Sequence, residues 1–136
     1  MRLTTDLPGD PPVIWEWINK RTGLPMSDDL RCIASMRDDG TISGVIAMNF
    51  WTEGACFMHM AFDTKHALTR ELLRAAFHYI FVESKRGAAY GLTSKTHTAA
   101  CVLNKKFGFR QIAETIDSVI FEMRHDECRW LNGGKR

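Results

Sequence analysis

Apolar and polar residues change their spacing several times along this chain, and each change marks a predicted element. From Val13 to Ile18 the apolar positions recur at helical spacing, which predicts an amphipathic helix near the N-terminus. Asp10 stands before two prolines and is the predicted N-cap, since proline suits the first helical turn. Gly23 is predicted to end the helix.

Strand-like runs follow the first helix. The segments Leu30–Met36 and Thr41–Trp51 are rich in apolar and β-branched residues, and Asp39-Gly40 between them is a strong hairpin signal. Glu53-Gly54 marks another turn, and Ala55–Asp63 is the third predicted strand. The first half of the chain therefore predicts a helix followed by an antiparallel meander.

Helical spacing returns from Thr69 to Ser84, where an apolar stripe is flanked by charged residues. We predict that Arg86-Gly87 stops this helix and that Ala88–Ser94 forms a short strand. A closing hairpin is predicted from the segments RQIA and SVIFEM, beginning at Arg110 and Ser118.

The stretch THTAACVLNKKFGFRQI predicts a helix that turns sharply into a strand. Thr96 or Thr98 is the expected cap, and lysines in the last turn favour the negative end of the helix dipole. Gly108 stands where a left-handed residue would close the helix. The apolar residues expected to face the core are Ala99, Ala100, Leu103, Phe107 and Phe109.

The order of these elements predicts an α/β (mixed α+β) fold, with helices packed on a sheet. At 136 residues, the chain is long enough for one hydrophobic core. We expect a single domain over residues 1–130 and a flexible tail at residues 131–136.

Composition narrows the classes of function. Hydrophobic residues make up 45% and charged residues 25%, and the net charge of +2 is too small to indicate nucleic acid or an anionic membrane. The N-terminus has no apolar signal region, so we expect a cytoplasmic protein. The four cysteines form no C-x-x-C pair, which argues against zinc and favours small buried side chains.

The segment from Ile42 to Met123 resembles the GNAT family of acyl-CoA-dependent N-acetyltransferases. The family pattern N-x-x-[AS]-x-x-x-[Y]-x-K-x-G-F aligns with Gly108 and Phe109 at its end. It places Ala100 at the small residue and Lys106 at the lysine, whereas His97 replaces the asparagine and Asn104 the tyrosine. The resemblance implies a GNAT-like fold, with a mostly antiparallel mixed sheet flanked by helices.

The resemblance also implies that acetyl-CoA binds. Its diphosphate would rest on the amides that open the helix after the third predicted strand, because a helix N-terminus binds anions. The family loop [RQ]-x-x-G-x-[GA] is degenerate here, with Ala67 and Thr69 at its small positions. The residues expected at the cofactor are Met60, Ala61, Phe62, Lys65, His66, Ala67, Leu68, Thr69, Arg70, His97 and Asn104.

The implied chemistry is attack of a neutral amine on a thioester. A backbone N–H between Met60 and Phe62 is the expected donor to the developing oxyanion. Candidate bases are His59 on the same strand, Glu53 before it, and His97. His59 has an ordinary pKa of about 6.5, which suits a base at neutral pH.

The family's customary acid is a tyrosine, and Asn104 holds that position here. An amide cannot donate a proton at neutral pH, so Asn104 would only hydrogen-bond the sulfur or a water. Tyr90 is the candidate substitute, although a tyrosine at such a position is more often a core residue. A thiol leaves with a pKa near ~8.5 by analogy with cysteine, so an acid is not obligatory.

We therefore expect transfer of an acetyl group from acetyl-CoA to a primary amine by direct attack in a ternary complex. The acceptor would be a small molecule or a peptide, with no nucleic acid or membrane partner. The alternative is an inactive GNAT-fold protein that serves in binding or assembly, which the degenerate loop and Asn104 favour. A homodimer is also an expectation, because exposed strand edges in small domains often pair.

Overall fold

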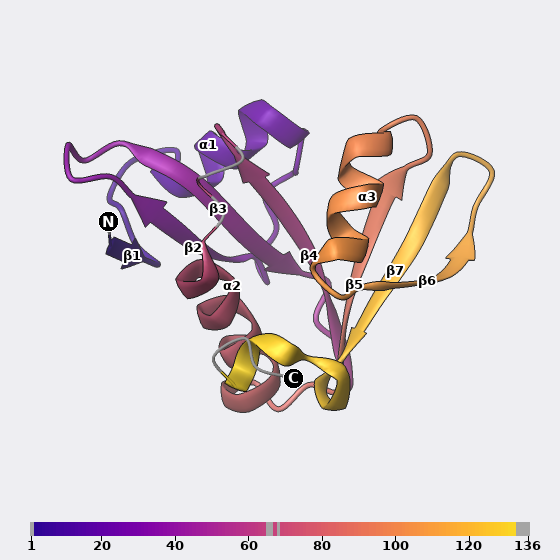
Figure 1. The fold of residues 1–136 in the computed structure, drawn as a ribbon. Coiled ribbons are helices and arrows are strands. Elements are labelled where there is room, and N and C mark those ends of the chain that lie inside the picture. The colour runs from indigo at the N-terminus through magenta and orange to yellow at the C-terminus, as the bar shows by residue number, and fades with distance from the viewer. Residues whose placement is uncertain (1, 65–66, 68, 133–136) are drawn as a thin grey trace.

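A seven-stranded sheet forms the centre of the computed structural model, which describes residues 2–64, 67 and 69–132. Its strand order is β1-β2-β3-β4-β5-β7-β6, and β4 with β5 is the parallel pair among antiparallel neighbours. This confirms the predicted mixed, mostly antiparallel sheet (Figure 1). The strands are β1 (Arg2–Thr4), β2 (Arg31–Met36), β3 (Ile42–Asn49), β4 (Ala55–Phe62), β5 (Ala88–Ser94), β6 (Arg110–Glu114) and β7 (Ser118–Arg124).

Helices cover both faces of this sheet. The first, α1 (Val13–Thr22), packs on β2, β3 and β4, and we call its side the α1 face. The opposite side, the α2 face, carries α2 (Arg70–Phe77), which continues as a π-helix (His78–Glu83), and α3 (Thr98–Lys106). None of the helices in the described part of the chain is long and apolar enough to cross a membrane.

Two predicted helix caps are wrong. Helix α1 begins with Pro12 as its N-cap, whose carbonyl accepts from the Glu16 amide at 3.0 Å, so Asp10 lies too far upstream. Helix α3 begins after His97 and has no side-chain cap. Thr96 instead has its hydroxyl 2.9 Å from the Ser94 hydroxyl, which removes it from the helix start.

The second helix has the predicted cap but a different end. The Thr69 hydroxyl accepts a hydrogen bond from the Leu72 amide at 3.3 Å, as its position before the stripe predicted. The helix runs through Glu83, and Lys85 then has a φ of 55°. The left-handed turn therefore lies at Lys85, before the predicted stop at Arg86-Gly87.

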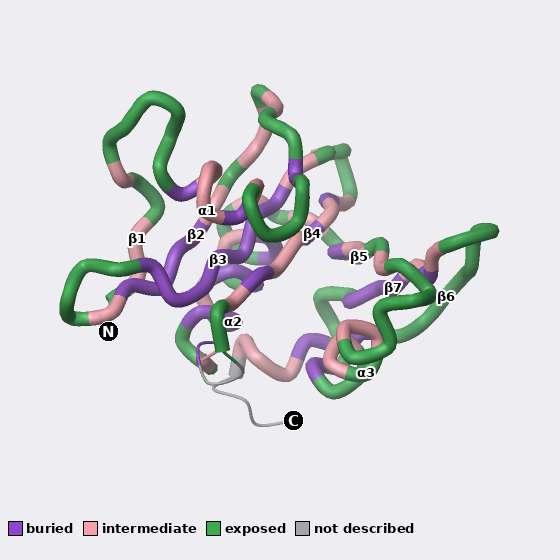
Figure 2. The backbone as a smooth tube through the Cα atoms, turned by 90° about the horizontal axis from the view of Figure 1, so that it is seen from above, coloured by how far each residue is buried: buried purple, intermediate pink, exposed green. Residues whose placement is uncertain are grey.

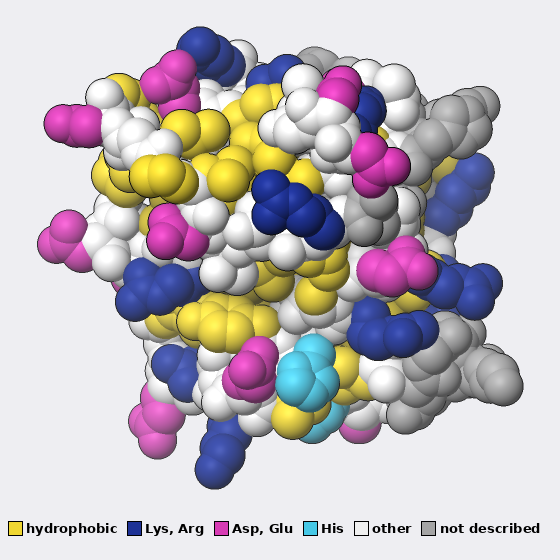
Figure 3. All heavy atoms as spheres, turned by 90° about the vertical axis from the view of Figure 1, so that its left-hand side faces the viewer, with side chains coloured by type: hydrophobic (Ala, Val, Ile, Leu, Met, Phe, Trp, Pro, Cys, Tyr) yellow, Lys and Arg dark blue, Asp and Glu magenta, His cyan; other side chains and the backbone are white. Residues whose placement is uncertain are grey.

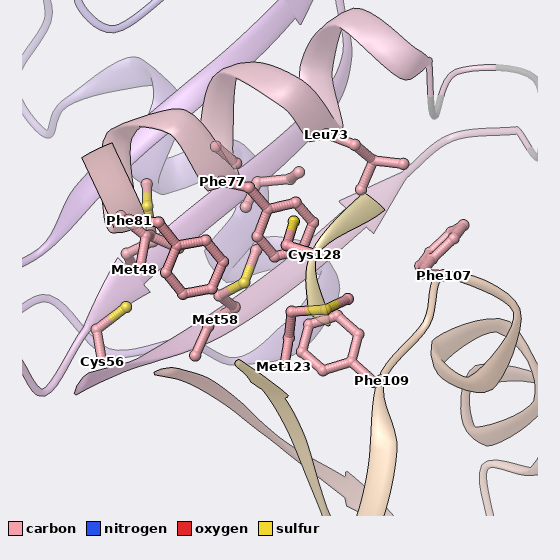
Figure 4. Packing of buried hydrophobic residues seen from close by; sticks show 14 of the residues in the cluster. Met48, Cys56, Met58, Leu73, Phe77, Phe81, Phe107, Phe109, Met123 and Cys128 are labelled. Atoms are coloured by element: carbon pink, nitrogen blue, oxygen red, sulfur yellow. The ribbon is translucent and has the colours of Figure 1, made fainter. Parts of the chain in front are cut away.

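The core forms one apolar cluster on each face of the sheet. On the α1 face, Ile14 and Ile18 pack against small and β-branched residues of β2 and β3. On the α2 face, aromatic rings from distant segments meet, as Figure 4 shows. The ring centroids of Phe77 on α2 and Phe109 are 6.0 Å apart. This cluster therefore packs strands β2–β4 together with the C-terminal strands.

The corner between α3 and β6 forms as predicted. Gly108 has a φ of 102°, and Phe107 and Phe109 on either side of it are both buried. The expectation for Ala99 is wrong, because it is exposed; α3 has no fully buried residue, and β6 is exposed throughout (Figure 2). Helix α3 contacts β5 and β6, and its Cys101 and Leu103 pack on the core only in part, whereas the C-cap residue Phe107 is buried.

The chain beyond β7 packs on the domain. Residues Arg129–Asn132 form a 3-10 helix, and the Trp130 indole donates to the Phe107 carbonyl at 2.8 Å. The predicted boundary at residue 131 therefore falls inside an ordered helix. Residues 133–136 lie outside the described residues, so a flexible tail stays a prediction there.

Cysteine burial agrees with the prediction for two of the four side chains. Cys56 and Cys128 are fully buried, whereas Cys32 and Cys101 are half-buried. None of the four forms a disulfide bond.

Candidate active site

The strands β4 and β5 pair over a short distance and then separate. Their parallel register covers Ala55–Phe57 against Ala88–Tyr90, and both strands continue beyond it without pairing to each other. Figure 1 shows β4 and β5 diverging from this end. A cavity of about 390 Å³ lies along the separated parts and is lined by Arg21, Thr22, Met58, His59, Met60, Gly91, Leu92, Thr93, Ser94, His97, Ala100, Asn104 and Phe109.

The register of β3 and β4 decides which amides point toward this gap. The Asp63 amide donates to the Ser43 carbonyl at 3.0 Å, one step beyond the ladder pair Gly44 and Phe62. Hydrogen-bonded pairs alternate along an antiparallel ladder, so Ala61 bonds β3 whereas Phe62 and Met60 do not. Of the three predicted cofactor residues on β4, Met60 and Phe62 thus direct their amides to the gap.

His59 lies on β4 beside the cavity and belongs to the α1 face. Its Nε2 lies 2.8 Å from the Asn49 side-chain oxygen. Burial lowers the pKa of His59 below its ordinary value. The imidazole is therefore neutral at neutral pH and can accept a proton.

The structure also brings His97 and Asn104 to this cavity. The Asn104 amide nitrogen donates to the Thr93 hydroxyl at 3.0 Å, so β5 fixes the side chain that replaces the family's tyrosine. Ala100 lines the same wall. The pattern around the KKFGF corner thus converges with His59 on one cavity.

Tyr90 does not lie among the residues that line the cavity. It pairs with Phe57 in the closed part of the strands, on the α1 face, and its hydroxyl donates to Glu122 at 3.0 Å. Burial and the neighbouring Glu122 carboxylate raise the pKa of Tyr90. Its proton is thus held by Glu122 rather than offered to the cavity.

Glu53 is exposed in the turn before β4, at the end where β4 and β5 pair. His59 lies six residues further along, roughly 20 Å away at about 3.3 Å per strand residue. The structure does not bring Glu53 to the cavity.

The predicted diphosphate loop is described in part. Lys65, His66 and Leu68 lie outside the described residues. Ala67 is buried, and its amide donates to the Thr64 carbonyl at 3.1 Å. Arg70 is exposed at the first position of α2. The first amides of a helix have no acceptor within the helix. In α2 the Leu72 amide instead donates to the Thr69 hydroxyl.

Sequence reasoning missed the side chains that α1 contributes. Arg21 and Thr22 at the end of this helix line the cavity, although nothing in their sequence context separates them from surface residues. It also missed Asn49, the partner of His59. Only the strand register brings Asn49 and His59 together.

A second cavity of about 950 Å³ lies between β1, β2 and α2. Figure 3 shows the side of the molecule that carries β1, where apolar side chains lie among charged ones. None of the predicted site residues that the structure describes lines this cavity. Among the described residues, no group of three His, Cys, Asp or Glu side chains is placed to hold a metal ion.

Solved structures share this fold. PseH, an N-acetyltransferase from Campylobacter jejuni, superposes with a TM-score of 0.68 at 16% identity, over 91% of this chain and 97% of that one. Its complex with acetyl coenzyme A gives a TM-score of 0.59 at 18% identity, over 82% and 77%. The spermidine/spermine N-acetyltransferase SpeG from Vibrio cholerae gives 0.67 at 12% identity, over 89% and 80%.

These similarities show that the chain has the fold of the GNAT N-acetyltransferases, as its resemblance to the family predicted. No protein-family model matches the sequence, and the comparison with curated proteins gave no match.

Proposed function

We propose that the chain transfers an acetyl group from acetyl-CoA to a primary amine, by direct attack in a ternary complex. One observation carries the proposal: β4 and β5 stop pairing after Phe57 and Tyr90, and a cavity follows where they separate. Strands paired along their whole length would leave no room for a pantetheine arm. The fold shared with PseH, which was crystallised with acetyl coenzyme A, supports the same cofactor.

The described residues fit acetyl-CoA at three points. The Met60 and Phe62 amides face the gap and can bind the pantetheine arm and the thioester. The start of α2 at Arg70 offers unpaired amides and partial positive charge to the diphosphate. The Thr69 hydroxyl accepts from the Leu72 amide and keeps its own O–H, which can donate to the same phosphate.

The chain's own groups then promote the reaction, for which bound acetyl-CoA supplies an activated acetyl thioester. His59 takes a proton from the ammonium form of the acceptor, and the neutral amine forms the new C–N bond as the C–S bond breaks. The nitrogen then loses a second proton, which the departing thiolate takes up to give free CoA. An amide of β4 donates to the negative charge that develops on the carbonyl oxygen. Asn104 can hydrogen-bond the departing sulfur, which needs no obligatory acid.

The cavity gives a first indication of the acceptor. Among its lining residues are Arg21, His59 and His97 but no aspartate or glutamate. Polycations such as the spermidine named for SpeG are bound best by carboxylates, so we favour a small amine or a peptide amine with a neutral or anionic group beside the nitrogen. The proposal includes no nucleic acid or membrane partner and places the protein in the cytoplasm.

The exposed edge of β6 is compatible with a homodimer. Size-exclusion chromatography with light scattering would measure the oligomeric state directly.

The test is calorimetric titration of the purified protein with acetyl-CoA. We expect a Kd in the micromolar range, and weaker binding of acetyl-pantetheine, which lacks the diphosphate. Release of free thiol in the presence of a panel of amines would then report transfer. Absence of heat at millimolar acetyl-CoA would reject the enzyme and leave the alternative, a binding or assembly protein, which Asn104 in place of the tyrosine favours.

A further inference from the structure

We infer that Asn49 is a positioning residue for His59, and that it makes Nδ1 the ring nitrogen that accepts the acceptor's proton. The contact between the Asn49 oxygen and His59 Nε2 carries this inference. As a statement about catalysis it rests on the proposed function, whereas the orientation of the ring is a property of the free protein.

Strand register explains why these two side chains meet. Asn49 pairs with Phe57, and Ala47 pairs with His59, so Asn49 and His59 are diagonal neighbours on the α1 face. Diagonal neighbours on one face of an antiparallel pair are close enough for long side chains to touch. The result is the 2.8 Å contact, made from the last residue of β3.

The contact fixes the tautomer of the ring. The oxygen of an asparagine amide accepts hydrogen bonds and cannot donate them, so His59 Nε2 must carry the hydrogen. A neutral imidazole has one N–H, which leaves the lone pair on Nδ1. A second hydrogen arrives only when the ring takes a proton, and Nδ1 is the atom that receives it.

An uncharged partner has a further effect on the base. A carboxylate at position 49 would stabilise the imidazolium and raise the pKa, so the ring would be protonated before the amine arrives. Asn49 orients the ring without this penalty. The other groups near His59 do not stabilise its protonated form. Arg21 and His97 line the same cavity, and a positive charge on either disfavours the imidazolium. The Cys32 thiol, in the same row across β3, is neutral.

Tyr90 is another titratable residue on this face, and it pairs with Phe57, two residues before His59 on β4. Its hydroxyl is bonded to Glu122, which is further paired with Arg110 and Arg124. The Glu122 carboxylate is thus paired with two guanidinium groups and accepts a hydrogen bond from Tyr90. His59 therefore has Asn49 as its hydrogen-bond partner in place of an acid.

The first experiment measures the ring itself. Long-range ¹H–¹⁵N NMR of the histidines in the ligand-free protein reports the tautomer and the pKa of His59, assigned with a His59→Gln variant. We expect the Nε2–H tautomer in the natural chain. Asn49→Asp keeps the acceptor and the shape of the side chain, and should keep this tautomer while raising the pKa by about 1 unit or more, as a carboxylate partner does.

Asn49→Leu removes the acceptor at similar volume. We expect the Nδ1–H tautomer to become populated, and kcat to fall by roughly 10-fold or more, a part of what a positioned base contributes. KM for acetyl-CoA should stay the same, because Asn49 lies on the α1 face. Asn49→Asp should move the acidic limb of the kcat/KM profile to higher pH and retain activity only above the raised pKa of His59.

The outcomes separate the two proposals. A Nδ1–H tautomer in the natural chain, or a tautomer and pH profile unchanged in a folded Asn49→Leu variant, overturns the role of Asn49. The predicted tautomer in a protein that binds no acetyl-CoA rejects the proposed enzyme while the Asn49–His59 contact stands. A His59→Ala enzyme with its full pH–rate profile rejects His59 as the base, and with it the positioning role.

Discussion

Replacement of Gly108 by alanine tests whether the corner between α3 and β6 needs a residue without a side chain. Gly108 has a φ of 102°, a region that L-residues with a Cβ rarely adopt. An added Cβ would lie 3.3 Å from the Met123 methyl and 3.7 Å from a nitrogen of Arg129. Both neighbours are the ends of flexible side chains and can move, so the backbone conformation dominates the cost.

A left-handed conformation costs a residue with a Cβ about 1–2 kcal/mol, and displacement of Met123 adds a little to it. We therefore expect Gly108→Ala to lower the free energy of unfolding by about 2 kcal/mol. For a domain of this size each kcal/mol corresponds to roughly 3–5 °C, so Tm should fall by about 6–10 °C. Urea unfolding followed by circular dichroism measures the free energy, and a thermal melt measures Tm.

Two other glycines provide matched controls. Gly40 has a φ of 88° and no atom within 4 Å of an added Cβ, so Gly40→Ala isolates the backbone cost. Gly54 has neither a positive φ nor a close neighbour, so Gly54→Ala should be neutral or stabilising by up to about 1 kcal/mol. If Gly108→Ala proved as stable as Gly54→Ala, the assignment of a left-handed corner would be wrong.

Two further substitutions test the site and its surroundings. Thr69→Trp places an indole at the proposed diphosphate site and should weaken acetyl-CoA binding at least about 10-fold by calorimetry. Thr69→Ser keeps the cap and should bind acetyl-CoA with normal affinity. Equal affinity for the two variants would exclude this site. Burial disfavours the charged form of Glu122, but hydrogen bonds from Tyr90 and two arginines outweigh it and hold the pKa of Glu122 below its ordinary value. The folded state therefore binds this proton less readily than the unfolded state does, so the stabilisation is complete above the unfolded pKa of about 4.3 and is lost as pH falls through the lower folded pKa. Urea unfolding should show a difference between the natural chain and Glu122→Gln that is constant near pH 7 and shrinks below about pH 4; a difference independent of pH would contradict this.

Local patterns were enough to predict most of the fold. The Asp39-Gly40 turn, the stripe after Thr69 and the glycine at position 108 each depend on a few consecutive residues, and all three formed as expected. The predicted caps at Asp10 and Thr96 were wrong because each residue lies upstream of the N-cap position, which Pro12 and His97 occupy. Hydrogen bonding to a neighbouring residue, as at Thr96, competes with capping and leaves no sequence signal.

The site was predictable only where one strand or one helix determined it. His59, His97 and Asn104 follow from the segment that resembles the family, and they meet at one cavity. Arg21 and Asn49 come from α1 and from the end of β3, and their places depend on how these elements pack. The place of Tyr90, a candidate acid or core residue, was open for the same reason, since its partner Glu122 lies more than thirty residues away on a different strand.

The aromatic cluster on the α2 face has a consequence for how a ligand enters. Phe77 and Phe109 hold the N-terminal and C-terminal halves of the sheet at a fixed angle, and Phe81 stacks on His125 at 5.1 Å beside them. Phe109 also lines the cavity beyond the paired part of β4 and β5, so the gap between these strands is already present in the free protein. A molecule that binds between the unpaired parts of these strands breaks no interstrand hydrogen bonds. Its affinity is therefore not reduced by the free energy of separating paired strands.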